Sequence, residues 1–268
     1  TLDIQNATFN YNGGSITGAG FLQFTTSNYI LALANFPAVY HKFFTTNVSS
    51  ALQLNNATTL HFYYNDSLNA DVLNKNGGVM RFSHYNNKIT GQITTQPNSL
   101  ISIDAGSYIG EAVFNNGFIN KGTLELKSIS GYQSNLTVLG SGLVNDTNAL
   151  FSIPTNYSTT RSYTGLLLNH GTLDISNTAY TYVNSNSFVN STAGLITGVG
   201  NLYFNSGYLL NHGEISPGAS PGIFTSTNGN IALSSTSKLK IEIGEPTAGT
   251  HHDQLACNVV DSLNGNLN

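Results

Sequence analysis

Charged residues are scarce in this chain of 268 residues, which has 9 Lys or Arg and 13 Asp or Glu and a formal net charge of −4. The cations form no run along the sequence. Proteins that bind nucleic acid electrostatically need clustered cations to displace counterions from the phosphate backbone. We therefore expect no nucleic-acid partner, and a largely neutral surface of hydroxyl and amide groups.

Cysteine is nearly absent, since Cys257 is the only one. A single cysteine cannot form a disulfide within the chain, so cysteine usage does not reveal the redox compartment. Long apolar runs are also missing, because the longest, residues 29–39, is interrupted by Asn35 and Pro37. A membrane-spanning helix needs about 20 apolar residues, so no transmembrane segment is expected.

The chain does contain a repeat. The pentapeptide LLNHG occurs at residues 167–171 and again at 209–213, and FINKG at 118–122 is a close variant. Two apolar residues followed by Asn also occur at 143–145 and 188–190. The resulting asparagines lie 25, 24, 21 and 21 residues apart, and they are Asn120, Asn145, Asn169, Asn190 and Asn211. Because such a unit is too short to fold alone, it must bury its apolar face against the next copy, as in a solenoid.

Short alternating segments such as TLEL at 123–126 and TLDI at 172–175 follow the repeated units, and no segment has a helical period. This pattern predicts an all-β fold, a right-handed parallel β-helix with about 21–25 residues per coil. We expect one solenoid over residues 1–268, with about nine to eleven coils. Residues 1–111 would form less regular coils, 112–213 regular coils and 214–268 a closing segment.

The repeated asparagines suggest an inward ladder. Asn tolerates the turn conformation, and its amide can bond to the equivalent amide of the next coil, about 4.8 Å away. Of the apolar pair before each Asn, one side chain should lie in the core and the other outside. The residue after each Asn varies in charge and is expected to be exposed: Lys121, Asp146, His170, Ser191 and His212.

The C-terminal part contains ISPGASPG at residues 215–222 and DQL at 253–255. This segment resembles the closing part of the passenger-type β-helices of autotransporter adhesins and related secreted surface proteins. The units NKGTL at 120–124 and NHGTL at 169–173 extend the likeness upstream. The resemblance implies an exported protein at a cell surface or outside the cell, and it implies no particular activity.

Eight Asn-x-Ser/Thr sequons would permit N-glycosylation in a secretory route. Two of them, Asn145 and Asn190, belong to the expected ladder, and an inward asparagine cannot accept a glycan. Glycans are therefore expected only at the other six: Asn6, Asn47, Asn56, Asn65, Asn135 and Asn156.

The sequence contains candidate residues for a metal site and for a polysaccharide-cleaving site, and both sets could also be ordinary surface residues. The sequence HHD at 251–253 contains metal-binding residue types, but adjacent strand residues face opposite sides, so solvated residues and no metal or cofactor are expected. Polysaccharide cleavage needs carboxylates, or a carboxylate and a base, gathered on one face. The densest group of charged and basic residues does not follow the coil period. It consists of Asp71, Arg81, His84, Lys88, Asp104 and Glu111.

We therefore expect a non-enzymatic, extracellular structural or adhesive surface protein, with no catalytic residues. TLDI at residues 1–4 repeats the segment at 172–175, so the chain is expected to begin within a coil. Exposed strand edges at the ends of a β-helix invite pairing. This predicts end-to-end self-association or continuation into further repeats, as in a fibre or stalk. The alternative is a carbohydrate-binding or polysaccharide-degrading β-helix that uses tyrosines and residues 60–111, with glycans as partners.

Overall fold

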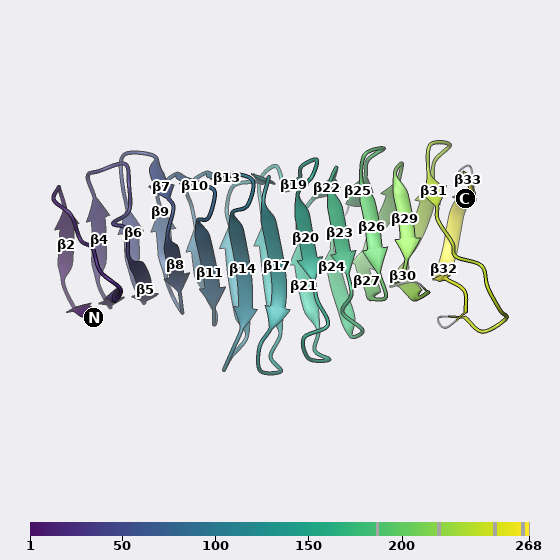
Figure 1. Cartoon of the computed structure of the whole chain (residues 1–268), viewed down its shortest axis with the longest axis horizontal. Coiled ribbons are helices and arrows are strands. Elements are labelled where there is room, and N and C mark those ends of the chain that lie inside the picture. Colours follow the sequence, from purple (N-terminus) through teal and green to yellow (C-terminus); the bar gives the residue numbers. More distant parts are fainter. Residues whose placement is uncertain (186–187, 219–220, 249–250, 264–265, 268) are drawn as a thin grey trace.

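The computed structural model is a parallel β-solenoid of about 11 turns, which confirms the predicted all-β parallel β-helix. It describes the chain apart from residues 186–187, 219–220, 249–250, 264–265 and 268. The coils stack along one long axis, with the two termini at opposite ends (Figure 1). Within the described part of the chain, no helix is long and apolar enough to cross a membrane.

Each regular coil contributes one strand to each of three rows. The first row is a 13-stranded parallel sheet. Its strands are β1 (Leu2–Gln5), β3 (Phe21–Thr25), β5 (Tyr40–Phe44), β8 (Thr59–Phe62), β11 (Val79–Ser83), β14 (Leu100–Ala105), β17 (Thr123–Ser128), β20 (Leu150–Ile153), β23 (Thr172–Ile175), β26 (Leu195–Gly198), β29 (Glu214–Pro217), β31 (Lys238–Leu239) and β33 (Asn266–Leu267).

The second and third rows alternate along the chain and join at β30 (Ile223–Leu233), which pairs with both rows and with β32 (Gln254–Leu263). The second row consists of β2 (Thr8–Tyr11), β4 (Asn28–Leu31), β6 (Asn47–Ser49), β9 (Ser67–Asn69), β12 (Asn87–Ile89), β15 (Gly110–Phe114), β18 (Ser134–Val138), β21 (Arg161–Thr164), β24 (Tyr180–Asn184) and β27 (Asn201–Ser206). The third row consists of β7 (Leu54–Asn56), β10 (Val72–Asn74), β13 (Ile93–Thr95), β16 (Phe118–Asn120), β19 (Leu143–Asn145), β22 (Leu167–Asn169), β25 (Phe188–Asn190) and β28 (Tyr208–Asn211).

Coil length varies more than the five asparagines indicate. Stacked residues of the first row are 19 residues apart between Leu22 and His41, and 28 apart between Leu239 and Leu267. The strands keep similar lengths, so the corner loops absorb the difference. In Figure 1 the loops that follow β14, β17 and β20 reach furthest beyond the strands at the lower edge.

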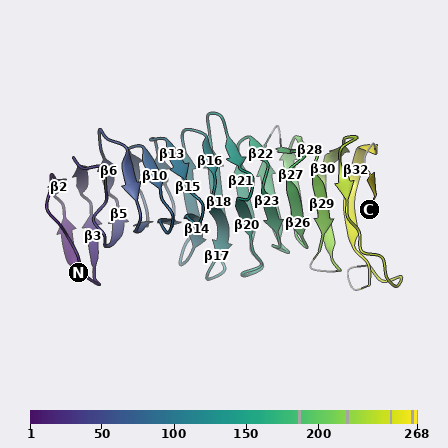
Figure 2. The same cartoon turned by 45° about the horizontal axis from the view of Figure 1, so that its top comes forward.

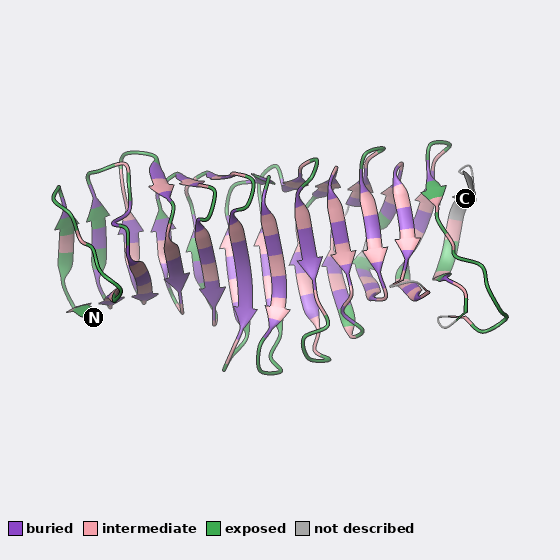
Figure 3. Ribbon diagram, in the orientation of Figure 1, coloured by how far each residue is buried: buried purple, intermediate pink, exposed green. Residues whose placement is uncertain are grey.

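Burial alternates along each strand, because successive side chains of a strand point to opposite faces (Figure 3). The inward positions of the first row form a stack of phenylalanines in the N-terminal half. The ring centroids of Phe24 and Phe43 are 5.7 Å apart, those of Phe43 and Phe62 are 4.8 Å apart, and those of Phe62 and Phe82 are 5.0 Å apart. This stack fills the core of the N-terminal coils, most of which precede the amide ladder described next.

The predicted ladder is present, and its asparagines are the last residues of successive third-row strands. Its five asparagines are completely buried, and the Nδ2 of each of the first four donates to the Oδ1 of the next at 2.7–2.9 Å. The preceding apolar pair divides as expected, since Phe118 is 2% exposed whereas Ile119 is 45% exposed. Of the residues that follow the asparagines, Lys121 is exposed and the other four are half-buried.

The ladder also extends into the irregular coils, which corrects one expectation. Asn56, expected as a glycan acceptor, is completely buried and donates to the Oδ1 of Asn74 at 2.8 Å. In LNN at 54–56 the outward second position is Asn55 instead of an apolar residue, and Asn56 lies in the column at the same register position as Asn74. Thr95 interrupts the column between Asn74 and Asn120, and its hydroxyl accepts from the N–H of Lys121 at 2.6 Å.

A second polar column lies between the first and second rows. Its central member, Asp66, is 1% exposed and accepts hydrogen bonds from the backbone N–H groups of Thr46 at 2.7 Å and Tyr63 at 2.8 Å. Asn87, in the next coil, donates to the backbone oxygens of Ser83 and Glu111. These side chains form hydrogen bonds with backbone N–H and C=O groups at the corner, which strand pairing leaves without partners.

The closing segment is held by Asp253, which was expected to be solvated. Asp253 is 5% exposed, and its carboxylate accepts from the N–H groups of Gly222 at 2.7 Å and Glu242 at 2.9 Å. The sequence missed this because a carboxylate can face inward wherever a turn offers it N–H donors. Gly218 has a φ of 99°, and a Cβ there would lie 2.5 Å from the nitrogen of Gly222. The ISPGASPG motif at 215–222 therefore has a structural role, since Asp253 binds its last residue. Its residues 219 and 220 lie outside the described part of the chain.

Candidate functional site

A continuous belt of aromatic and histidine rings crosses the outer face of the first row and the adjoining corner. It passes through six consecutive coils, from β3 to the loop after β17. We call it the aromatic belt, and it consists of Phe21, Tyr40, Phe44, His61, Tyr63, Tyr64, His84, Tyr85, Tyr108 and Tyr132.

The belt begins as a stack on the strands. The rings of Tyr40 and His61 are nearly parallel, with centroids 6.2 Å apart, and His61 and Tyr63 are in close contact at 3.9 Å. Phe44 stacks on Tyr63 at 4.2 Å. The positions arise from strand alternation, because Leu60 and Phe62 point into the core on either side of His61.

The belt then continues along the corner loops. His84 lies 5.0 Å from Tyr108, and Tyr108 lies 6.4 Å from Tyr132, measured between ring centroids. Tyr85, Tyr108 and Tyr132 are 46%, 56% and 46% exposed. Rings this exposed can accept the apolar face of a ligand while their hydroxyl groups form hydrogen bonds.

His61 is held in place by its neighbours. Its Nδ1 lies 2.7 Å from the hydroxyl oxygen of Tyr40, and its Nε2 lies 2.8 Å from the Oγ of Ser83. Burial, assisted by the nearby charge of Arg81, lowers the pKa of His61 to about 3. The imidazole is therefore neutral at ordinary pH, and it is a weak base.

A group of charged side chains, the ionic cluster, adjoins the belt on β11, β14 and β17. Arg81 Nε lies 2.9 Å from Asp104 Oδ2, and Lys127 Nζ lies 3.7 Å from Asp104 Oδ1 and 2.8 Å from Glu125 Oε2. Ser102 donates to Asp104 as well. The Asp104 side chain is 1% exposed and that of Arg81 is 37% exposed, so the cluster presents a cation and buries an anion.

The six charged residues suggested by the sequence do not gather at one place. Arg81 and Asp104 form the ion pair, and His84 joins the belt. Glu111 accepts from the N–H of Asn86, and Asp71 accepts from the N–H of Gln92 at another corner. Lys88 is exposed on the second row. Nothing in the sequence marked the other members, Tyr40, His61, Tyr63, Glu125 and Lys127, as neighbours, because coil lengths are irregular.

The histidines of the two LLNHG copies lie two coils apart. Ser191 lies between them in the stack, and its Oγ is 2.7 Å from Nδ1 of His170. No group of three His, Cys, Asp or Glu side chains able to hold a metal ion occurs in the part of the chain that the structure describes.

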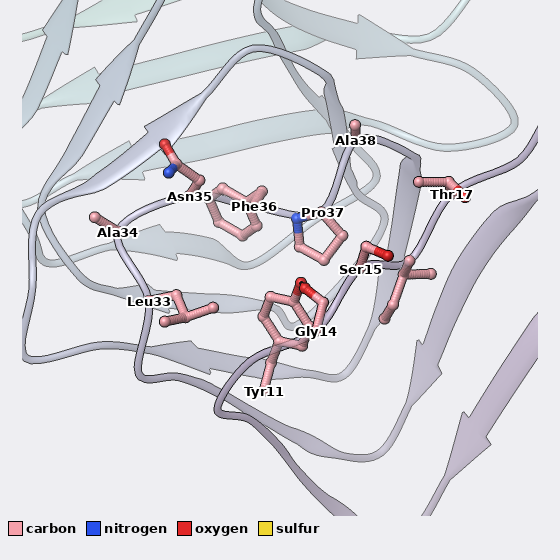
Figure 4. Close-up of a pocket in the computed structure, with 11 residues that line it drawn as sticks. Tyr11, Gly14, Ser15, Thr17, Leu33, Ala34, Asn35, Phe36, Pro37 and Ala38 are labelled. Atoms are coloured by element: carbon pink, nitrogen blue, oxygen red, sulfur yellow. The ribbon is translucent and has the colours of Figure 1, made fainter.

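A hollow of about 370 Å³ lies beside the first two coils (Figure 4). Tyr11, Phe36 and Pro37 line it, and the hydroxyl of Tyr11 donates to the backbone oxygen of Gly14 at 2.7 Å. The third row begins only with β7, so residues 12–20 and 32–39 cross this side as loops. The hollow is the space that a third-row strand fills in later coils.

The geometry sharpens the glycosylation prediction. In a eukaryotic secretory host, we expect the folded protein to have no glycan at Asn56, Asn145 or Asn190, because all three are completely buried. Among the remaining sequons, Asn6, Asn65 and Asn156 are exposed, and Asn47 and Asn135 are half-buried. Peptide mapping by mass spectrometry after enzymatic deglycosylation measures the occupancy. A glycan on any of the three ladder residues in folded protein would contradict the ladder.

Buried histidines make the stability depend on pH. His41 is completely buried against Tyr29 and Phe43, and burial lowers its pKa to about 4. Since this is below the unfolded value, His41 contributes stability above about pH 6.5 that is lost as the pH falls toward 4. We expect His41→Phe to reduce the loss of unfolding free energy over that window by roughly 3 kcal/mol.

Urea unfolding of both proteins at pH 7 and pH 4.5 tests this. Burial raises the pKa of Asp66 to about 8, which favours the folded state at acidic pH, but this contribution is the same in both proteins and cancels. Parallel pH profiles for the wild type and His41→Phe would contradict the prediction.

No protein-family model, no curated protein and no solved structure matches the chain.

Proposed function

We propose that the protein is an extracellular, non-enzymatic adhesive element of a surface, and that the aromatic belt binds an extended carbohydrate. The observation that carries this proposal is the continuity of the belt over six coils. Sugar rings have apolar C–H faces that pack on aromatic rings, and peripheral hydroxyls that bond to tyrosine, amide and guanidinium groups. A linear chain of sugars offers such faces repeatedly, as the belt does.

The chemistry of the site favours binding over cleavage. An acid–base mechanism needs a proton acceptor or donor that reaches the substrate. The carboxylate of Asp104 is buried beneath Arg81, Lys127 and Ser102. Both nitrogens of His61 have partners, and its low pKa makes it a poor base.

The surface location is supported by the closing motif and by composition. The segment at 215–222 and Asp253 resemble the closing part of exported β-helices. With 8% charged residues, the coils expose mainly amide and hydroxyl groups, which suit contact with polysaccharide and with other coils. Apolar residues of the terminal coils, such as Ile16 and Leu255, are only partly buried, which supports end-to-end association of copies.

Binding can be tested with two variants. We expect Tyr108→Ala combined with Tyr132→Ala to weaken binding at least 10-fold in a screen of plant, algal and bacterial polysaccharides, because each exposed ring contributes about 1 kcal/mol or more. Tyr157→Ala is the matched control, since Tyr157 is 55% exposed but lies outside the belt. Affinity electrophoresis or calorimetry measures binding, and analysis of released sugars monitors cleavage.

The proposal fails if the wild type binds no polysaccharide in the set, or if the control weakens binding as much as the double variant. Release of shortened product by the wild type would favour the degrading alternative.

A further inference from the structure

The outward side of the third row differs from the other two outer faces. Eight successive register positions contain seven aliphatic residues and one threonine: Leu73, Thr94, Ile119, Val144, Leu168, Val189, Leu210 and Ala232. We call this column the aliphatic stripe. Ile119 is exposed and the others are half-buried by their neighbours in the stack. Figure 2 brings the upper edge, where these strands lie, toward the viewer.

The stripe is not a general property of the surface. Outward positions of the second row are mostly polar, among them Asn47, Ser67, Lys88, Thr137 and Thr164, and Val113 is the apolar residue between Lys88 and Thr137. The first row exposes the ionic cluster and the belt. A continuous, partly exposed aliphatic column along one face of a solenoid indicates a contact surface.

We propose that the aliphatic stripe is a lateral interface between two copies of this chain, packed antiparallel face to face. A stripe with the repeat of the coils is matched best by another stripe with the same repeat, as in a two-fold interface. Packed sheets keep their strand directions within about 30°, and a two-fold axis along the strands satisfies this while reversing the solenoid axis.

The polar residues that border the stripe favour one register of the two copies. The stripe is bordered by the residues that follow the ladder positions: Lys75, Gln96, Lys121, Asp146, His170, Ser191, His212 and Ser234. An axis midway between Val144 and Leu168 overlaps all eight coils of both copies. It places Asp146 of one copy opposite His170 of the other, and Lys121 opposite Ser191.

Other positions of the two-fold axis leave part of the stripe uncovered. An axis through the coil of Val144 sets Asp146 against Asp146 and leaves one coil uncovered. The border carries Lys75, Lys121 and Asp146, which is too little positive charge to attract an anionic lipid surface. A second copy is therefore the occupant that the border and the repeat favour.

The size of the stripe sets the strength of the contact. Eight coils at about 4.8 Å extend for roughly 34 Å, and a strand face of about three residues is roughly 10 Å wide. This footprint is smaller than the roughly 800 Å² that each partner contributes to a stable interface. The dimer should therefore be weak, with a dissociation constant on the order of 10–100 µM.

Analytical ultracentrifugation of the full chain from 5 to about 500 µM tests the proposal. We expect a monomer–dimer equilibrium in the wild type, and at least a 10-fold rise in the dissociation constant for Leu168→Lys, which introduces two charges into the contact. Thr137→Lys, an outward substitution on the second row, is the matched control and should leave the equilibrium unchanged. Circular dichroism checks that both variants fold.

A charge exchange tests the register, and it does not depend on the folding of Leu168→Lys. Asp146→Lys should weaken the dimer, His170→Asp should weaken it by opposing Asp146, and the combination D146K/H170D should restore it. A wild type that stays monomeric at 500 µM overturns the proposal, as does a dimer that Leu168→Lys leaves unchanged or that Thr137→Lys weakens equally. Failure of the charge exchange to restore association overturns the antiparallel register.

Discussion

Replacing Arg161 by methionine is expected to lower the free energy of unfolding by roughly 3–5 kcal/mol, although Arg161 lies in a short strand and is not part of the belt. Arg161 is completely buried, and its guanidinium donates hydrogen bonds to the loop that follows β20. Nε donates to the backbone oxygen of Leu126 at 3.3 Å, Nη1 to that of Thr159 at 2.7 Å, and Nη2 to that of Asn156 at 3.0 Å. No carboxylate forms an ion pair with it among the residues placed in the structure.

The cost has two sources. Methionine keeps the apolar stem but removes a donor from each of these carbonyl groups, of which that of Thr159 keeps Nδ2 of Asn177. Unsatisfied buried acceptors cost about 1–3 kcal/mol each before water enters. Burial lowers the pKa of Arg161 to about 10, so the side chain remains charged at neutral pH and the carbonyl oxygens provide its solvation. Lysine should restore only part of the loss, because one ammonium group cannot reach both Leu126 and Asn156.

Urea unfolding measures the loss, and hydrogen exchange should show it first in residues 154–160, because neighbouring coils of a solenoid can open separately. Lys88→Met is the control: it removes an exposed cation from the same row and should change stability by less than about 0.5 kcal/mol. A loss below about 1 kcal/mol for Arg161→Met would mean that water replaces the guanidinium.

The sequence predicted the features that repeat and missed those that depend on register. The ladder from Asn120 to Asn211 was predictable because an amide after two apolar residues recurs at nearly constant spacing. Asn56 was missed because the residue before it is Asn55 and not an apolar residue, so LNN does not match the repeated pattern although its register is unchanged.

The belt could not be predicted, since strand alternation tells which face a residue lies on but not which residue of the next coil lies beside it. Tyr40 and His61 are 21 residues apart, whereas Tyr108 and Tyr132 are 24 apart. Only the lengths of the corner loops decide such neighbours. A lone arginine such as Arg161 gives no signal at all, because its partners are backbone oxygens that every residue has.

The ladder gives the second large effect. Asn169 accepts from Nδ2 of Asn145 at 2.8 Å and donates to Oδ1 of Asn190 at 2.7 Å and to the backbone oxygen of Leu195 at 3.2 Å. Asn169→Leu, which has a similar volume, should lower the free energy of unfolding by roughly 3–5 kcal/mol, because buried groups in three adjacent coils lose partners at once. Equilibrium urea unfolding measures it.

Two comparisons separate the ladder from a general effect of removing an amide. Asn69→Leu deletes an amide that also bonds to a neighbouring coil, the preceding one, through Asn47, but at an exposed position where water replaces the partner. Its cost should stay below about 1 kcal/mol. Asn169→Thr should cost an intermediate amount, because Thr95 already occupies a ladder position and bonds to the backbone of the next coil at 3.1 and 2.6 Å. If leucine is tolerated equally at 169 and 69, packing of the strands alone holds the coils in register, and the amide column follows from the stack without stabilising it.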